Sequence, residues 1–149
     1  MKFYEPFSVM VVGSYQQAKL MMVRLWTPIT RPLPWKFRLM PICAACLKPI
    51  NLAPAAHHAI LSQRYEWARC ALWNLAPVHQ SPEGDCHDRL AHGAYRDIVI
   101  QRLYWIVGNG DPEAGKQIIV NCLTREMTCP PGLPEIRKEG LWQRETAIN

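Results

Sequence analysis

The chain has 149 residues, of which 49% are hydrophobic and 19% are charged. This composition is typical of a folded domain and excludes a disordered chain. No apolar stretch approaches the ~18–20 residues that a membrane span needs. Glu5 and Pro6 precede a short apolar run without a small-residue cleavage site, which argues against a signal peptide. We therefore expect a cytoplasmic protein of about one domain, with no membrane partner.

The net charge of +5 is concentrated near the start of the chain. Residues 1–42 contain six basic residues and one acidic residue, whereas basic and acidic residues balance in 43–92 and in 93–149. An anionic partner such as nucleic acid would be attracted to this first third. A basic surface that only keeps the protein soluble is an equally open interpretation.

The first third is predicted to be extended. Two segments, Phe7–Val12 and Leu20–Trp26, are rich in Val, Met and aromatic residues, and four prolines follow between positions 28 and 41. Proline removes a backbone donor and favours extended geometry in the residue before it. We expect a basic, proline-rich N-terminal arm, or strands, over residues 1–42.

Short elements are predicted in the middle of the chain. Residues 43–56 contain Pro49 and Pro54, which exclude a long helix and indicate a tight knuckle followed by a loop. A strand is expected over 57–61, a helix over 62–72 with Ser62 as its N-cap, and a loop over 73–85.

Helices are predicted in the last third. Asp85 has the N-cap position before a short helix, and Gly93 separates that helix from a longer one. Apolar residues recur at helical spacing from Tyr95 to Ile106. Asp111 and Pro112 begin another helix, so we place helices in 94–128 and a loosely held tail in 129–149.

Histidine and cysteine residues cluster in one part of the sequence. All five histidines fall within 36 residues, and Cys43, Cys46, Cys70 and Cys86 lie inside or just before that window. Disulfides do not require nearby imidazoles, whereas a metal site does. The pattern therefore favours metal binding over a disulfide framework.

Four of these residues have the spacing of a structural zinc site. Two residues separate Cys43 from Cys46, which lets both sulfurs reach one ion. His79 and Cys86 would supply the second pair across a loop that contains Pro and Gly, and would complete a Cys3His zinc site. The alternative is a pair of free thiols with an unrelated histidine.

The order of motifs in residues 43–93 resembles the HNH endonucleases, in particular phage-type members. The motifs are Cys-x-x-Cys at 43–46, His-His-Ala-Ile at 57–60, Asn-Leu-x-x-Val-His at 74–79 and Cys-His at 86–87. The resemblance implies an α+β fold with a small, treble-clef-like ββα-metal core and a structural zinc ion. His79 departs from the family pattern because it stands where many members have cysteine.

The resemblance also implies roles for four further residues. His58 is similar to the general base that accepts a proton from water, and His57 and His87 are similar to the ligands of a single catalytic divalent ion. Asn74 resembles the middle Asn, which orients the loop or contributes to the metal site. His92, five residues after His87, is more typical of a surface histidine, and the alternatives are that it binds phosphate or completes the metal site.

The activity implied is hydrolysis of phosphodiester bonds in DNA. A neutral histidine accepts a proton near neutral pH, and Mg²⁺, Mn²⁺ or a transition metal ion would stabilise the charge that develops on phosphate. Arg64, Arg69 and Arg89 flank the motif and could contact phosphates, or they could be solvated surface residues. For a phage-encoded chain, the site of action would be the bacterial cytoplasm, and a phage or host protein is a candidate partner.

Two other interpretations remain open. A non-catalytic zinc module that binds nucleic acid or protein would need Cys43, Cys46, His79 and Cys86 only. A degenerate nuclease fold that serves as an assembly partner would retain the histidines without activity.

Overall fold

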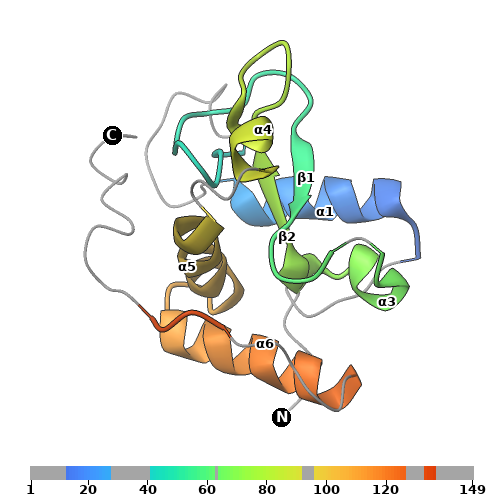
Figure 1. Cartoon of the computed structure of the whole chain (residues 1–149), viewed down its shortest axis with the longest axis vertical. Coiled ribbons are helices and arrows are strands. Elements are labelled where there is room, and N and C mark those ends of the chain that lie inside the picture. Colours follow the sequence, from blue (N-terminus) through green and yellow to red (C-terminus); the bar gives the residue numbers. More distant parts are fainter. Residues whose placement is uncertain (1–12, 28–40, 63, 92–95, 127–132, 137–149) are drawn as a thin grey trace.

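The computed structural model describes residues 13–27, 41–62, 64–91, 96–126 and 133–136 (Figure 1). These residues form a mixed structure of helices with a small two-stranded sheet. The elements, in order, are α1 (Tyr15–Trp26), β1 (Ala55–His58), α3 (Glu66–Arg69), the 3-10 turn η2 (Leu72–Asn74), β2 (Leu75–Val78), α4 (Cys86–Ala91), α5 (Arg96–Val107) and α6 (Pro112–Glu126). The expected α+β class is therefore confirmed. None of the described helices is both long and apolar enough to cross a membrane.

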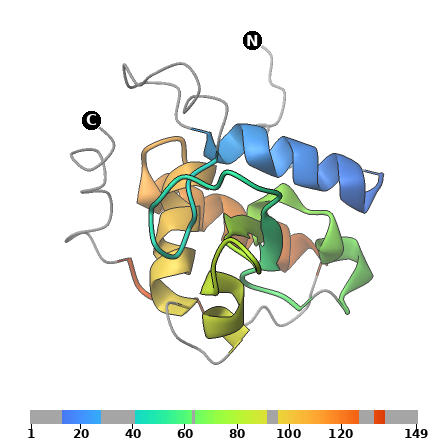
Figure 2. The same cartoon turned by 90° about the horizontal axis from the view of Figure 1, so that it is seen from above.

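The two strands form an antiparallel hairpin that lies between α1 and α4 (Figures 1 and 2). His57 is opposite Ala76 and His58 is opposite Leu75 in the register. Successive side chains of a strand point to opposite faces of the sheet. The hairpin therefore directs the two adjacent histidines to different sides.

The prediction of extended structure over Leu20–Trp26 is wrong, because this segment belongs to helix α1. The Ser14 hydroxyl accepts a hydrogen bond from the backbone N–H of Gln17 and caps the helix. Ala18, Met22 and Trp26 recur at four-residue spacing and are buried, so the helix presents one apolar stripe to the core. The composition suggested a strand, but the four-residue spacing of the buried side chains is typical of a helix. Phe7–Val12 lies outside the described residues.

The loop predicted over 73–85 is also partly wrong, since it contains β2. Proline cannot donate a backbone hydrogen bond, so it disfavours a central strand. In a two-stranded sheet each strand has one unpaired edge, where proline is tolerated. Pro77 pairs with Ala56, and its carbonyl oxygen accepts a hydrogen bond from the N–H of Ala44. The strand predicted at 57–61 begins earlier, at Ala55.

The helix predicted over 62–72 is much shorter than expected. Only Glu66–Arg69 is helical, and Tyr65 rather than Ser62 has the N-cap position. The Ser62 carbonyl and hydroxyl accept hydrogen bonds from the N–H groups of Tyr65 and Arg64. These local bonds form a turn, which is the alternative that serine offers to a helix.

The predicted C-terminal helices are confirmed as α5 and α6. Asp111 caps α6, because its carboxylate accepts hydrogen bonds from the N–H groups of Glu113 and Ala114. The tail is held more firmly than expected where it is described. The hydroxyl of Tyr104 donates to the carbonyl oxygen of Pro134 across 2.9 Å, so residues 133–136 are attached to α5.

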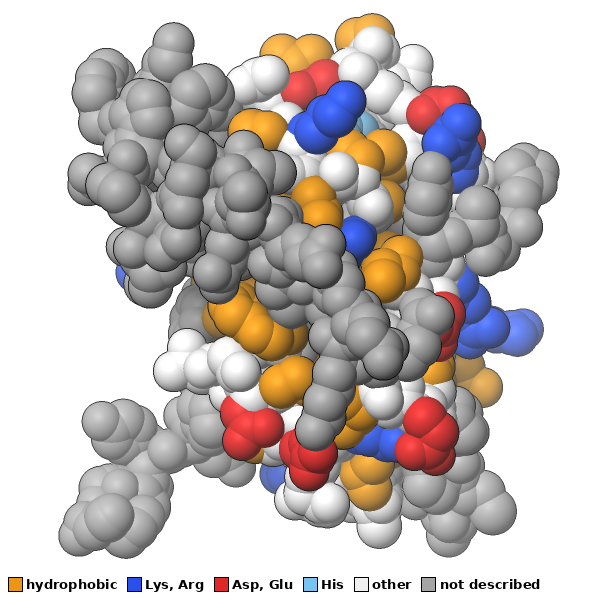
Figure 3. Space-filling view, turned by 90° about the vertical axis from the view of Figure 1, so that its left-hand side faces the viewer, with side chains coloured by type: hydrophobic (Ala, Val, Ile, Leu, Met, Phe, Trp, Pro, Cys, Tyr) orange, Lys and Arg blue, Asp and Glu red, His pale blue; other side chains and the backbone are white. Residues whose placement is uncertain are grey.

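A single hydrophobic core joins the N-terminal helix, the hairpin and the C-terminal helices. Its largest fully buried side chains come from all three parts and include Met22, Trp73, Leu75, Leu103 and Leu123. On the face shown in Figure 3, described acidic and basic side chains are interspersed, with hydrophobic side chains between them. The core explains why the elements around the hairpin hold a fixed position relative to it.

We predict that Gly115→Ala destabilises the protein, although alanine normally favours a helix by ~1 kcal/mol over glycine. A Cβ atom at this position of α6 would lie 1.8 Å from the carbonyl oxygen of Tyr104 in α5. The helices would have to separate, at a cost of ~1–3 kcal/mol in the free energy of unfolding. Gly13→Ala is the control, because nothing lies within 4 Å of the added atom. Thermal melting of both variants measures the difference, and equal melting temperatures would contradict the prediction.

Candidate functional site

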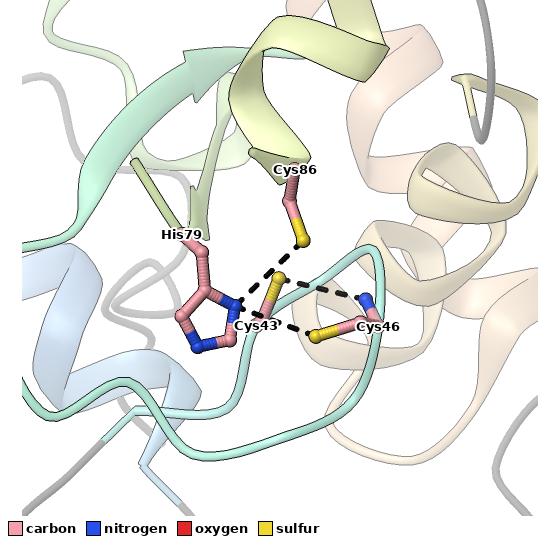
Figure 4. Close-up of side chains that lie close together, drawn as sticks. All are labelled: Cys43, Cys46, His79 and Cys86. Carbon is pink, nitrogen blue, oxygen red and sulfur yellow. Dashed lines mark hydrogen bonds between the residues drawn. The ribbon is translucent and has the colours of Figure 1, made fainter. Parts of the chain in front are cut away.

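Cys43, Cys46, His79 and Cys86 point toward one common centre (Figure 4). Their candidate ligand atoms all lie within 4.8 Å of one another. His79 Nδ1 is 3.4 Å from the sulfur of Cys46 and 3.7 Å from that of Cys86. A tetrahedral zinc ion with bonds of ~2.3 Å to sulfur and ~2.05 Å to nitrogen would place S and N ~3.5 Å apart. The cluster therefore fits a structural metal ion such as zinc.

Residues 43–48 form the knuckle that carries two of the sulfurs, and backbone hydrogen bonds within this segment hold its turn. The N–H of Cys43 donates to the carbonyl oxygen of Lys48, and the N–H of Leu47 donates to that of Cys43. The sulfur of Cys43 accepts hydrogen bonds from the N–H groups of Ala45 and Cys46. Leu47 has a φ of 67°, a conformation that is uncommon for a non-glycine residue. The tight turn brings both sulfurs to the same side.

Contacts of the ring nitrogen that faces away from the sulfurs orient the ring of His79. Its Nε2–H donates to the carbonyl oxygen of Pro49 at 3.0 Å, and a Glu83 carboxylate oxygen lies 3.7 Å from the same nitrogen. Glu83 also accepts hydrogen bonds from the N–H groups of Asn51 and Leu52. A histidine that donates from one ring nitrogen offers the other to a metal. Nδ1, which faces the sulfurs, would therefore be the ligand atom.

The loop that joins the second pair of ligands folds back closely on His79. A Cβ atom added at Gly84 would lie 3.0 Å from the Cβ of His79, so glycine permits this close approach. The N–H of His87 donates to the carbonyl oxygen of His79 at 3.0 Å. This bond brings the start of α4, and with it Cys86, next to the end of β2. The loop therefore places His79 and Cys86 at the same centre.

The three thiols of the cluster affect one another's pKa values. Hydrogen bonds, above all from the Cys46 side chain, lower the pKa of the Cys43 thiol. The same contact and then burial raise the pKa of Cys46, and burial is the main factor that raises the pKa of Cys86. Like charges at one point cannot all ionise without compensation. A divalent cation would supply it, since metal-bound cysteines are thiolates.

A buried arginine from α5 donates hydrogen bonds to the backbone of the knuckle. Arg102 is 7% exposed, and its guanidinium donates hydrogen bonds to the carbonyl oxygens of Ala44 and Ala45, the second at 2.8 Å. Three thiolates and one divalent ion carry a net negative charge. The buried positive charge next to the knuckle would therefore stabilise the metal-loaded cluster.

A second group of histidines lies beside the cluster. The ring centres of His57, on β1, and His87, on α4, are 6.1 Å apart and the rings are nearly perpendicular. Burial, followed by the charges of His87, His58 and Arg96, lowers the pKa of His57 to about 4. The neutral imidazole that a metal requires is thus the prevailing form at neutral pH.

His58 lies on the other face of β1. Its Nε2–H donates to the carbonyl oxygen of Arg69 at 3.1 Å, and its ring stacks on that of Tyr15 with centres 6.0 Å apart. Nδ1 is then the nitrogen that can accept a proton. Burial lowers the pKa of His58 from its ordinary value of 6.5, and the hydrogen bond to Arg69 opposes this effect.

Asn74 is completely buried, and backbone groups of the loop between the strands occupy its amide. Its oxygen accepts hydrogen bonds from the N–H groups of Ile60 and Leu61, and its nitrogen donates to the carbonyl oxygens of Leu61 and Ala68. Of the two roles predicted for Asn74, these bonds favour the loop-orienting role over metal ligation. The amide holds together the turn that carries Arg69 and, through it, His58.

The three arginines predicted to contact phosphate all have exposed side chains. Arg64 and Arg69 belong to the loop and short helix between the strands, whereas Arg89 lies on α4 and is 3.5 Å from the carboxylate of Asp85. Their exposure is compatible with either predicted role, substrate contact or solvated surface. His92 lies outside the described residues.

No protein-family model, no curated protein and no solved structure matches this chain. The function therefore rests on the geometry of the site. That geometry adds residues that the sequence analysis did not identify, namely Tyr15, Glu83 and Arg102. The contact of His79 with Glu83 lies in a loop, where a four-residue spacing does not predict contact as it does in a helix. Arg102 lies 58 residues from Ala44, so no local pattern connects the two.

We predict that Cys86→Ser removes the bound metal and lowers the melting temperature. Serine cannot supply the thiolate, and a structural metal contributes directly to folding. Elemental analysis should fall from about one zinc per chain to almost none. Cys70→Ser is the matched control, because this half-buried cysteine lies outside the cluster. Retention of stoichiometric metal by Cys86→Ser would contradict the assignment of this ligand.

We also predict that Arg102→Met weakens metal binding ~10–100-fold, the usual effect of losing a residue that supports the ligands. Methionine fills similar space but leaves the carbonyl oxygens of Ala44 and Ala45 without these donors. Competition with a chromogenic chelator measures the affinity. Arg102→Lys should keep part of it, because the charge remains. Unchanged affinity in Arg102→Met would exclude the proposed support.

Proposed function

We propose that the protein is a metal-dependent nuclease of the HNH type that hydrolyses phosphodiester bonds in DNA. The proposal assigns zinc to the Cys3His cluster and assigns a second, catalytic divalent ion to His57 and His87. It is supported by the order of elements: a cysteine knuckle, a hairpin that carries paired histidines, and a helix that begins with Cys86 and His87.

The juxtaposition of His57 and His87 carries this proposal. An ion held at ~2.1 Å by one nitrogen of each ring would keep the ring centres at most ~6.4 Å apart. The observed 6.1 Å is at the long end of the range for two rings that share one ion. Among the described residues, only the Cys3His cluster gathers three or more candidate ligands. A site with two protein ligands has coordination positions left for water and phosphate.

The chain itself supplies the proton acceptor. Because Nε2–H of His58 is engaged with Arg69, Nδ1 would accept the proton of the attacking water. Asn74 would keep this arrangement by holding the loop that contains Arg69. The divalent ion, when bound, would stabilise the negative charge that develops on the phosphate and the leaving oxygen. Arg64 and Arg69 would position the strand through its phosphates without reading the bases.

Nicking of supercoiled plasmid by the zinc-loaded protein tests the proposal. We expect nicking to require added Mg²⁺, Mn²⁺ or a transition metal ion. His58→Ala should reduce the rate by ~10²–10⁴-fold, the usual contribution of a general base, while the zinc content stays unchanged. Gln117→Ala is the control, because its side chain is exposed on α6 and its amide nitrogen donates to Asn121.

One outcome would support a different function. The Cys3His cluster is complete without His57 and His58, so the same scaffold also suits a non-catalytic zinc module that binds nucleic acid or protein. One zinc per chain with no nicking in any of the divalent ions would overturn the nuclease proposal and favour this module. Absence of zinc in the purified protein would contradict both.

A further inference from the structure

Helix α1 contributes an aromatic ring directly to the surroundings of His58. Tyr15 lies in its first turn, and the rings of Tyr15 and His58 are stacked with an angle of 13° between their planes. Tyr15 is half-buried. The ring thus contacts the core on one side and reaches the surface on the other. A helix that precedes the metal-binding region in the sequence therefore forms part of the same site.

Two cations converge on the ring of Tyr15. The ammonium of Lys19, four residues further along α1, lies 5.8 Å from the ring centre, and the guanidinium carbon of Arg69, on α3, lies 5.3 Å from it. Both distances are within the ~6 Å of a cation–π contact. The ring holds the charged ends of two separate elements close to His58.

No carboxylate of the described residues forms an ion pair with Lys19 or Arg69. Helix α1 itself contains Lys19 and Arg24 but no acidic residue. Both positive charges lie within ~6 Å of the same ring, so an anionic ligand bound there would be attracted to both.

Lys19 also borders an open groove of about 320 Å³ between α1 and the segment before β1. Its lining is largely apolar and includes Leu20, Val23, Ala53 and Pro54. Leu20 is 68% exposed. A nucleic-acid strand has a charged backbone next to sugars and bases with apolar faces. A cation at the rim of an apolar groove matches both parts of such a strand.

We propose that Tyr15 and Lys19 of α1, together with Arg69, form a binding surface for the phosphate backbone of the nucleic-acid strand beside His58. This inference rests on the proposed function and adds its substrate-binding surface. Lys19 and Arg69 would contact phosphates and set the position of the strand, which requires no base recognition. Tyr15 would keep the two cations together and hold them next to His58.

Binding of fluorescently labelled oligonucleotides, followed by anisotropy at several salt concentrations, tests the proposal. The zinc-loaded protein is used without any other divalent ion, so that binding is measured without cleavage. Loss of one phosphate contact reduces the slope of log K against log salt by ~0.7–0.9. We expect this reduction, with weaker binding, for Lys19→Gln. Separate measurements with single-stranded DNA, duplex DNA and RNA show which kind of nucleic acid the surface binds.

Arg24→Gln is the matched control for charge. With ~3.6 residues per turn, Arg24 lies on the opposite side of α1 from Tyr15, and its side chain is exposed. Its salt slope should equal that of the unchanged protein. Tyr15→Phe should keep the affinity, because the ring remains, whereas Tyr15→Leu should weaken binding. Melting temperature and zinc content confirm that each variant is folded.

Equal salt slopes for Lys19→Gln and Arg24→Gln would overturn the proposed surface, as would the absence of binding to every oligonucleotide. Cleavage is measured separately in the nicking assay. Nicking by a protein whose Lys19→Gln variant binds normally would leave the nuclease function intact and contradict only the surface. A reduced slope in a protein that never nicks would support the surface and contradict the nuclease.

Discussion

The meeting of four ligand atoms at one point is the constraint on which the rest of the structure depends. The ligands come from the knuckle, the end of β2 and the start of α4. Backbone hydrogen bonds repeat the same connections, from Ala44 to Pro77 and from His87 to His79. A strand pair of four residues each is too small to be stable alone. A metal ion in the cluster would therefore fix both the hairpin and the helix that packs on it.

The C-terminal helices complete this arrangement through one buried charge. A buried guanidinium is costly unless its hydrogen bonds and charge are compensated. Arg102 finds acceptors in the carbonyl oxygens of Ala44 and Ala45, inside the knuckle itself. The thiolates of a metal-loaded cluster would compensate its charge. The folding of α5 and α6 and the loading of the metal are thus expected to reinforce each other, although the sequence places them far apart.

Features that depend on residues close together in the sequence, or on distinctive residue types, could be predicted, whereas features that depend on other contacts between distant residues could not. Cysteine and histidine are chemically distinctive, so the spacing of Cys43, Cys46, His79 and Cys86 was enough to assemble the cluster. Capping at Asp111 is local and was also predicted correctly. Helix α1 was mistaken for extended structure because composition outweighed the spacing of its buried residues. Strand β2 was missed because Pro77 disfavours a strand in the absence of tertiary pairing. The contacts of Tyr15 and Arg102 exist only in the folded chain.

The separation of the cluster from the histidine site follows from two periodicities. Consecutive residues of a helix diverge by ~100°, so Cys86 can face the knuckle while His87 faces β1. Consecutive residues of a strand point to opposite faces, so His57 faces α4 while His58 faces Tyr15 on α1. In the proposed nuclease, a phosphate within reach of both histidines would therefore lie across the end of β1, where His58 is the last residue. His58 stacks on Tyr15 of α1, so a strand bound at this position would lie within reach of that helix, as the proposed binding surface requires.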